Sequence, residues 1–210
     1  INTGRGEAAF FMLPDGTTML VDAGALPPAR ERTTAARPDD SRSPGEWITR
    51  YILHMLKEHA EKKLDYILLT HFHGDHMGVI NPDAKSSKSN EYKLSGITEV
   101  GDRIPFDKII DRGWDYPSAI HDENVDNYKH FVNWHKLNNN VEAGQFVPGQ
   151  NNQVALRNHP QRYPSFRLQN IAANGMVWTG VAENTKNWFP PVEAMDPSDV
   201  PNENMCSVAF

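Results

Sequence analysis

Two apolar runs near the start of the chain, separated by a turn sequence, predict a β-hairpin. The runs cover residues 8–13 and 17–21, and the sequence between them is Pro14-Asp15-Gly16. Proline presets the φ angle of an early turn position and glycine adopts the positive φ of a later one, so a tight connection between two strands is expected. Residues 27–44 are polar, contain prolines and carry mixed charge, which predicts a loop.

The next segment has apolar residues at spacings of three and four, which predicts an amphipathic helix running to about Lys63. Residues 43–46 have the form of a capping box with proline in the first turn. The apolar face consists of Ile48, Ile52, Met55, Leu56 and His59. Residues 64–70 (LDYILLT) are typical of a short buried strand, and the order hairpin, helix, strand favours an α/β fold.

Weaker patterns follow along the rest of the chain. They predict a strand at 106–111, a helix from the N-cap Asp122 to about Leu137, and a hairpin of residues 165–172 and 176–180 around Ala173-Asn174-Gly175. They also predict a solvated loop at 85–90, an irregular segment at 188–204 and a strand at 204–210. Because the chain stops inside that apolar run, we expect it to be a fragment, with a natural edge strand as the alternative. No repeat or compositional break marks a second domain, so one domain over 1–210 is expected.

Composition and charge narrow the class of protein. The 210 residues are 39% hydrophobic and 23% charged, which is typical of a folded domain. No stretch approaches the roughly 18 apolar residues of a membrane span. The 21 basic and 27 acidic side chains give a net charge of −6, which does not favour nucleic acid as a partner, although a local basic patch stays open. The single cysteine, Cys206, excludes an internal disulfide and a cysteine-rich zinc module.

One segment directly after the predicted buried strand concentrates candidate metal ligands. His71, His73, Asp75 and His76 fall within six residues. Imidazole nitrogen and carboxylate oxygen are ligands of zinc and similar divalent ions. An extended backbone sends His71 and His73 to one side, and Gly74 allows a bend that returns Asp75 and His76 to the same point. A histidine-rich surface loop is the alternative, but this spacing at the exit of an apolar strand favours a metal site.

On these residues the sequence resembles the metallo-β-lactamase superfamily, whose signature is His-x-His-x-Asp-His after a strand. Residues 3–8, 14–16 and 20–24 resemble the opening hairpin of the branch that includes the lactamase-like domain of DNA-uptake (competence) channel proteins. Residues 202–208 resemble the Asn-x-x-Ser strand of that branch. The resemblance implies an α/β fold, the αββα sandwich of the superfamily. This chain would hold its N-terminal half, with an irregular insertion over about 81–200.

The resemblance implies a role for each matching residue. His71 and His73 would bind a first metal ion, and Asp75 and His76 a second. Asp75 would also act in catalysis by orienting the nucleophile. Asp22 would brace the metal loop by hydrogen bonds, with a simple turn aspartate as the alternative. One or two divalent ions are implied, with zinc first and manganese or iron as further options.

The superfamily completes its site with three later ligands, a histidine, a bridging aspartate and a final histidine. The last two are expected beyond Phe210, so this chain would hold half a site with partial metal occupancy. Four histidines are candidates for the middle ligand. His121 and His159 lie in predicted loops, whereas His130 and His135 lie on the predicted polar helix, where solvated surface histidines are expected.

The implied activity is that of a metal-dependent hydrolase that uses a metal-activated water to cleave a phosphodiester or an ester- or amide-type bond. The substrate would be a small molecule or a nucleotide-type compound. A catalytically incomplete metal-binding or interaction domain of the same fold is the alternative, and redox iron chemistry ranks last. Two roles are open for Arg112, contact with an anionic substrate and a surface ion pair. A cytoplasmic protein and an exported one whose leader has been removed both fit a chain that begins at Ile1.

Overall fold

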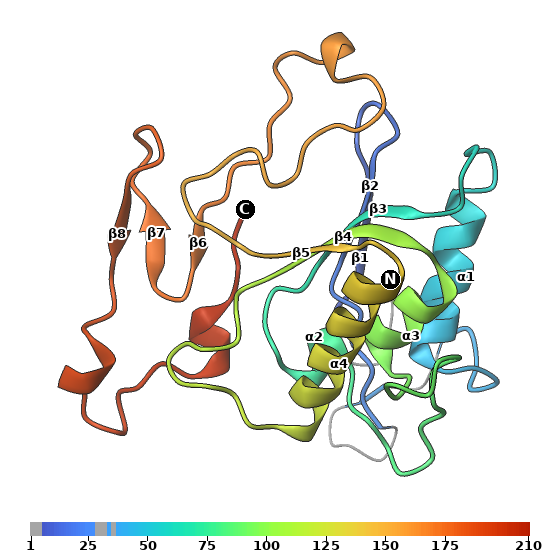
Figure 1. Ribbon diagram of the computed structural model, residues 1–210, viewed down its shortest axis with the longest axis horizontal. Coiled ribbons are helices and arrows are strands. Elements are labelled where there is room, and N and C mark those ends of the chain that lie inside the picture. The colour runs from blue at the N-terminus through green and yellow to red at the C-terminus, as the bar shows by residue number, and fades with distance from the viewer. Residues whose placement is uncertain (1–5, 28–32, 35–36) are drawn as a thin grey trace.

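Five strands form a central sheet in the order β1-β2-β3-β4-β5 (Figure 1). The computed structural model describes residues 6–27, 33–34 and 37–210. Strands β1 and β2 pair antiparallel, and β2 to β5 pair parallel. The strands are β1 (Ala9–Met12), β2 (Thr18–Val21), β3 (Leu64–Leu68), β4 (Phe106–Asp111) and β5 (Glu142–Gln145).

The pairing register brings the carboxyl ends of three parallel strands to one edge of the sheet. Val21 at the end of β2 pairs with Leu68 at the end of β3, and Leu68 pairs with Ile110 of β4. The residues that directly follow these strands therefore lie side by side. In open α/β sheets this edge is where ligands bind.

Helices cover one face of this sheet, and a later part of the chain covers the other (Figure 1). The helices are α1 (Pro44–Met55), α2 (Gly74–Met77), α3 (Gly96–Arg103) and α4 (Glu123–Asn138). Alternate strand residues point to opposite faces. Leu20 and Ile67 therefore pack with α1, α3 and α4, whereas Met19 and Leu68 pack on the other face. That second core is completed by Phe146, Val154, Leu168, Ala173 and Val208.

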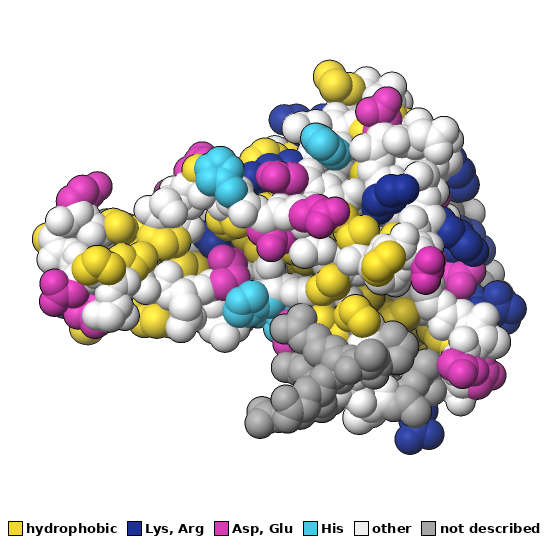
Figure 2. All heavy atoms as spheres, turned by 90° about the horizontal axis from the view of Figure 1, so that it is seen from below, with side chains coloured by type: hydrophobic (Ala, Val, Ile, Leu, Met, Phe, Trp, Pro, Cys, Tyr) yellow, Lys and Arg dark blue, Asp and Glu magenta, His cyan; other side chains and the backbone are white. Residues whose placement is uncertain are grey.

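A second, smaller antiparallel sheet lies beside the first. Its strands are β6 (Ala172–Ala173), β7 (Met176–Trp178) and β8 (Thr185–Asn187). The C-terminal residues connect the two sheets, because Val208 N donates to Thr70 O (3.0 Å) and Ala209 forms a bridge with Ala172. Yellow hydrophobic side chains stay visible over this part of the molecule in Figure 2, and Trp188, next to β8, is 64% exposed. No described helix has the length and hydrophobicity of a membrane span.

Several predicted elements are confirmed, namely the first hairpin, the strand at 106–111 and the helix after Asp122. The capping box at the start of α1 is also present, because Glu46 N donates to Ser43 Oγ (3.2 Å) and Ser43 N donates to Glu46 Oε2 (3.3 Å). The predicted end of this helix near Lys63 is wrong. Helix α1 ends at Met55, because Leu56 is the last buried residue and the chain must turn back to begin β3.

Three other expectations need correction. The second hairpin forms around residues 173–175, but residues 165–171 are not a strand. The expected strand at 204–210 is largely replaced by η3 (Glu203–Cys206), a 3-10 helix that begins where Asn202 Oδ1 accepts from Met205 N (3.2 Å). The segment 81–200 is more regular than expected, since it contributes α3, β4, α4 and β5. Parts of the predicted segments 3–8 and 27–44 lie outside the described residues.

Candidate metal centre

Asp22, the residue directly after β2, connects the ends of β2 and β3. Its backbone has a φ of 57°, a left-handed conformation that aspartate tolerates better than most residues. The side chain is 1% exposed. Asp22 Oδ1 accepts from Thr70 N, and Asp22 Oδ2 accepts from the Thr70 hydroxyl, both at 2.7 Å. The carboxylate therefore holds the start of residues 70–76, which we call the histidine loop.

His76 at the other end of the histidine loop also hydrogen-bonds to Asp22. His76 Nδ1 lies 2.8 Å from Asp22 Oδ2. A carboxylate can only accept, so Nδ1 carries the proton and Nε2 keeps a free lone pair. Burial alone would lower the pKa of His76, but the hydrogen bond and charge of Asp22 outweigh it and raise that pKa. The bracing role expected of Asp22 agrees with this geometry.

His71 is held in the same tautomer through Thr70. The single hydroxyl proton of Thr70 goes to Asp22, so Thr70 Oγ1 accepts from His71 Nδ1 at 3.1 Å. His71 Nε2 is buried and has no hydrogen-bond partner. Burial, with the neighbouring rings of His76 and His73, lowers the pKa of His71 to about 4. A neutral ring with a bare, buried nitrogen fits a metal ligand, because a metal-binding imidazole must be unprotonated.

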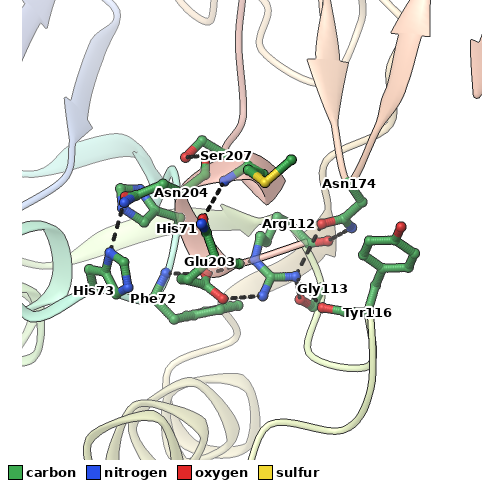
Figure 3. Close-up of polar contacts among 12 residues, drawn as sticks. His71, Phe72, His73, Arg112, Gly113, Tyr116, Asn174, Glu203, Asn204 and Ser207 are labelled. Atoms are coloured by element: carbon green, nitrogen blue, oxygen red, sulfur yellow. Dashed lines mark hydrogen bonds and ion pairs between the residues drawn. The ribbon is translucent and has the colours of Figure 1, made fainter. Parts of the chain in front are cut away.

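His73 is oriented from a distant part of the chain. His73 Nδ1 lies 3.1 Å from Asn204 Oδ1, 131 residues away (Figure 3). An amide oxygen accepts, so His73 also carries its proton on Nδ1 and leaves Nε2 free. The ring centroids of His71 and His73 are 5.0 Å apart, and those of His71 and His76 are 3.9 Å apart. Three imidazoles with the same tautomer thus lie together at the sheet edge, and His71 contacts the other two.

Asp75 lies on α2 and lines a cavity that borders the histidine loop. This cavity has a volume of about 520 Å³, and its polar lining includes His73, Asp75, Glu203 and Asn204. Leu26, Phe72, Met77, Val79, Ile120 and Val125 supply the apolar lining. The structure therefore brings His71, His73 and His76 together and places Asp75 beside them, at the edge of a space in which a substrate could lie.

The described part of the chain contains one group of three histidine or acidic side chains whose ligand atoms lie within 4.8 Å of one another: Glu7, Asp22 and His76. Sequence reasoning did not include Glu7. We assign this group to hydrogen bonding rather than to metal, because both Asp22 oxygens already accept from Thr70 and one of them accepts from His76. The lone pairs that stay available are the Nε2 atoms of the histidines.

The backbone of α2 packs closely against the first hairpin. Glu7 N donates to Asp75 O (2.8 Å), and Ala23 N donates to His76 O (2.7 Å). A Cβ atom at Gly6 or Gly24 would lie 2.1 Å or 2.0 Å from Asp75 O. Only glycine allows this approach, so these two positions help to fix the histidine loop.

The four other candidate histidines lie elsewhere, and the described residues show no hydrogen bond or ring contact between them and the histidine loop. His121 and His130 are exposed, and His159 N donates to Asp15 in the first hairpin turn (3.0 Å). The expectation of a solvated His135 is wrong. It is 4% exposed, and burial lowers its pKa to about 4.

Sequence reasoning also missed a buried ion pair behind the histidine loop. Arg112 is 0% exposed and forms two parallel hydrogen bonds with Glu203. Neither role considered for Arg112, a substrate contact or a surface ion pair, is correct. Burial raises the pKa of Glu203, but hydrogen bonds from Arg112 and from Phe72 N outweigh it and lower that pKa. In the sequence, the one available signal for this ion pair was the position of a charged residue, Arg112, directly after a buried strand.

Comparison with known proteins agrees with this architecture. A family model described as the metallo-beta-lactamase superfamily matches residues 2–127, a range that contains the first hairpin, β3, the histidine loop and β4. A search of curated proteins found no significant match. Members of this superfamily usually bind divalent metal ions such as zinc and act as hydrolases. The mixed sheet with its covering helices has the expected α/β character, and the chain belongs to the metallo-β-lactamase superfamily.

Proposed function

We propose that this protein is a metal-dependent hydrolase whose site is formed by the histidine loop. The observation that carries this proposal is the shared hydrogen-bond pattern of His71, His73 and His76. Each ring has Nδ1 against an acceptor, Thr70, Asn204 and Asp22 respectively, and so keeps Nε2 free. Such outer hydrogen bonds orient metal-ligating histidines in proteins.

Within this proposal each residue has a defined task. His71 and His73 would hold a first ion, and Asp75 and His76 would hold a second. A bound divalent ion supplies Lewis acidity, which lowers the pKa of water toward about 7. Asp75, which lines the cavity, would also orient the attacking water by accepting its hydrogen bond. Asp22 and Thr70 would hold the Nδ1 protons of His76 and His71 and keep the two rings aligned.

The lining of the cavity guides the choice of substrate. Apolar side chains such as Ile120 and polar ones such as Asn124 line it together, so it suits a small molecule with both characters. A phosphodiester of nucleotide type and an ester- or amide-type bond are the two proposed targets. The resemblance to DNA-uptake proteins favours the first, and the net charge of −6 does not favour a long nucleic acid. We also propose that residues 1–210 form one domain, with 81–200 supplying a wall of the cavity.

Metal analysis combined with activity tests this proposal. We expect the purified chain to bind zinc or manganese and to hydrolyse bis(p-nitrophenyl) phosphate or p-nitrophenyl acetate in a metal-dependent way. The double variant His71→Ala/His73→Ala should lose both metal and activity, whereas His130→Ala, with an exposed side chain, should keep both. Metal retention by the double variant would contradict the assignment of the site.

A metal-binding domain without complete catalytic machinery is the second candidate. It is favoured by the positions of His121, His130, His135 and His159, none of which contacts the histidine loop in the described structure. It predicts partial metal occupancy and no hydrolysis of either compound. Two tightly held ions per chain, with turnover, would exclude this candidate.

A further inference from the structure

We propose that Asn204 is a positioning residue that sets the tautomer of His73. Glu203 and Arg112 fix the position of Asn204 relative to the histidine loop. This inference rests on the proposed metal site and adds the part of the chain that prepares it. The relevant residues come from η3, the end of β4 and the histidine loop (Figure 3).

Asn204 contacts the ring of His73 directly. Asn204 Oδ1 lies 3.1 Å from His73 Nδ1, and both residues line the cavity that contains Asp75. A solvated imidazole exchanges its proton between the two ring nitrogens, whereas a fixed acceptor at Nδ1 selects one form. With Asn204 in place, His73 presents the free lone pair of Nε2.

The position of Asn204 is itself fixed by η3. Asn202 Oδ1 accepts from Met205 N (3.2 Å) at the start of this short helix, and Ser207 Oγ donates to Asn204 O (2.8 Å) at its end. Cys206 anchors the turn in the interior, because its side chain is 0% exposed. The amide of Asn204 therefore projects from a segment with few available conformations.

The Glu203 side chain forms a hydrogen bond with the backbone of the same loop. Glu203 Oε1 accepts from Phe72 N at 2.6 Å, and Phe72 lies between His71 and His73. Neighbouring residues of η3 thus hold two parts of the histidine loop, Asn204 a ring and Glu203 the peptide beside it. A rotation of the His73 ring would break the contact with Asn204, and a displacement of the loop backbone would break the contact with Glu203.

Arg112 keeps Glu203 in this position. Its Nε donates to Glu203 Oε1 at 2.8 Å and its Nη2 donates to Glu203 Oε2. Nη1 donates to Tyr116 O (2.7 Å) and to Asn174 Oδ1 (3.1 Å). The guanidinium also lies over the Phe72 ring, 5.0 Å from its centroid. A planar group with so many fixed partners cannot be replaced by lysine without loss of geometry.

Metal affinity should therefore depend on a segment 131 residues from the histidine loop. Removal of an outer hydrogen bond to a ligating histidine typically lowers metal affinity about 10- to 100-fold. We expect a loss of this size for Asn204→Leu, which keeps the shape of the side chain but removes the acceptor. Asn204→Asp keeps an acceptor and should restore affinity.

The experiment compares these two variants with Met205→Leu, a control in the same short helix whose side chain is 53% exposed. Zinc affinity is measured by competition with a chelator. The tautomer of His73 is measured by nitrogen-15 NMR on the metal-free protein at about pH 8, above the ordinary pKa of a free imidazole. Asn204→Ala is made as a second variant without the acceptor, in case Asn204→Leu does not fold.

Each outcome decides a separate point. The inference is supported if His73 is protonated at Nδ1 in the wild type, Asn204→Asp and Met205→Leu, and changes tautomer in Asn204→Leu or Asn204→Ala together with the loss of affinity. It is overturned if the tautomer and affinity of these variants equal those of the wild type. If the wild type binds no zinc, the proposed function fails, and the NMR measurement on metal-free protein still decides the role of Asn204.

Discussion

Asp22 and His76 form a hydrogen bond of 2.8 Å between Oδ2 and Nδ1, and this contact ties the end of the histidine loop to the end of β2. The same carboxylate accepts two hydrogen bonds from Thr70, at the beginning of the loop. One buried side chain thus determines both ends of a segment of seven residues and the proton position on two of its histidines.

The substitution Asp22→Asn should weaken metal binding and stability together. An amide cannot accept all three of these hydrogen bonds, so at least one buried donor loses its partner. We expect zinc affinity to fall about 10- to 100-fold and the free energy of unfolding to fall by about 1–3 kcal/mol. Chelator competition and urea unfolding measure the two effects. Asp83→Asn, at an exposed loop position, is the control, and equal zinc affinity in the two variants would refute the bracing role.

A methyl group at Gly24 should displace the histidine loop. The Cβ of Gly24→Ala would lie 2.0 Å from Asp75 O, so the backbone of α2 must move. We expect a loss of about 1–3 kcal/mol in the free energy of unfolding, along with weaker zinc binding. Gly144→Ala is the matched control, because a Cβ there meets nothing within 4 Å. A Gly24→Ala protein as stable as Gly144→Ala would show that the close approach is not needed.

Substitution of Arg112 alone should destabilise the protein more than substitution of Arg112 and Glu203 together. Arg112→Met leaves the half-buried Glu203 carboxylate without its cation, and breaking such a pair costs about 3–5 kcal/mol. The double variant Arg112→Met/Glu203→Gln removes the unpaired charge and should recover part of that loss. Urea unfolding of wild type, both single variants and the double variant gives the coupling energy. Strictly additive losses would contradict a direct interaction.

The stability of the fold should fall in acid because of His135. Its Nε2 lies 3.0 Å from the Tyr92 hydroxyl, and its Nδ1 lies 2.9 Å from Asn139 Nδ2. Burial lowers its pKa from 6.5 to about 4 in the folded state. Between these two values the unfolded chain binds more protons, so this contribution is complete above pH 6.5 and is lost as the pH falls toward 4. The loss amounts to about 3 kcal/mol.

The variant His135→Gln isolates this effect, because glutamine does not titrate. The difference in free energy of unfolding between wild type and His135→Gln should shrink by up to about 3 kcal/mol between pH 7 and pH 4. His130→Gln on the exposed side of α4 is the control and should follow the wild-type pH profile. A difference between wild type and His135→Gln that stays constant with pH would show that His135 is not held neutral.

The sequence predicted those elements whose signals are local. The Pro14-Asp15-Gly16 turn, the Ser43–Glu46 capping box and the Asp122 N-cap each depend on neighbouring residues, and all three are confirmed. Strand β5 was missed because Glu142–Gln145 has no apolar alternation and forms by pairing with β4 at the sheet edge. Such strands are determined by tertiary contacts rather than by propensity.

Helix α3 was missed for a related reason. Two glycines lie within Gly96–Arg103, and glycine lowers helix propensity by about 1 kcal/mol. Gly101 is required by packing, since a Cβ there would lie 2.5 Å from the Phe131 ring. Local preference is thus overridden by the contact between α3 and α4.

The grouping of the three histidines could be predicted from the sequence, and the resemblance added Asp22 as a brace, but the contacts from η3 could not be predicted. The spacing of His71, His73 and His76 pointed to a shared centre, and their rings do lie in contact. The roles of Glu203 and Asn204 had no local signal, because each acts on a residue 131 positions away. The expected strand at 204–210 even assigned Asn204 the wrong backbone conformation.

The distance in sequence between the histidine loop and η3 has a consequence for the order of events during synthesis. A growing chain exposes His71 and His73 long before Asn204 leaves the ribosome, and N-terminal segments begin to fold first. Bringing the two segments together closes a long loop, with an entropic cost that only the finished domain repays. A nascent chain therefore carries His73 without its acceptor until η3 has been synthesised and packed against the histidine loop.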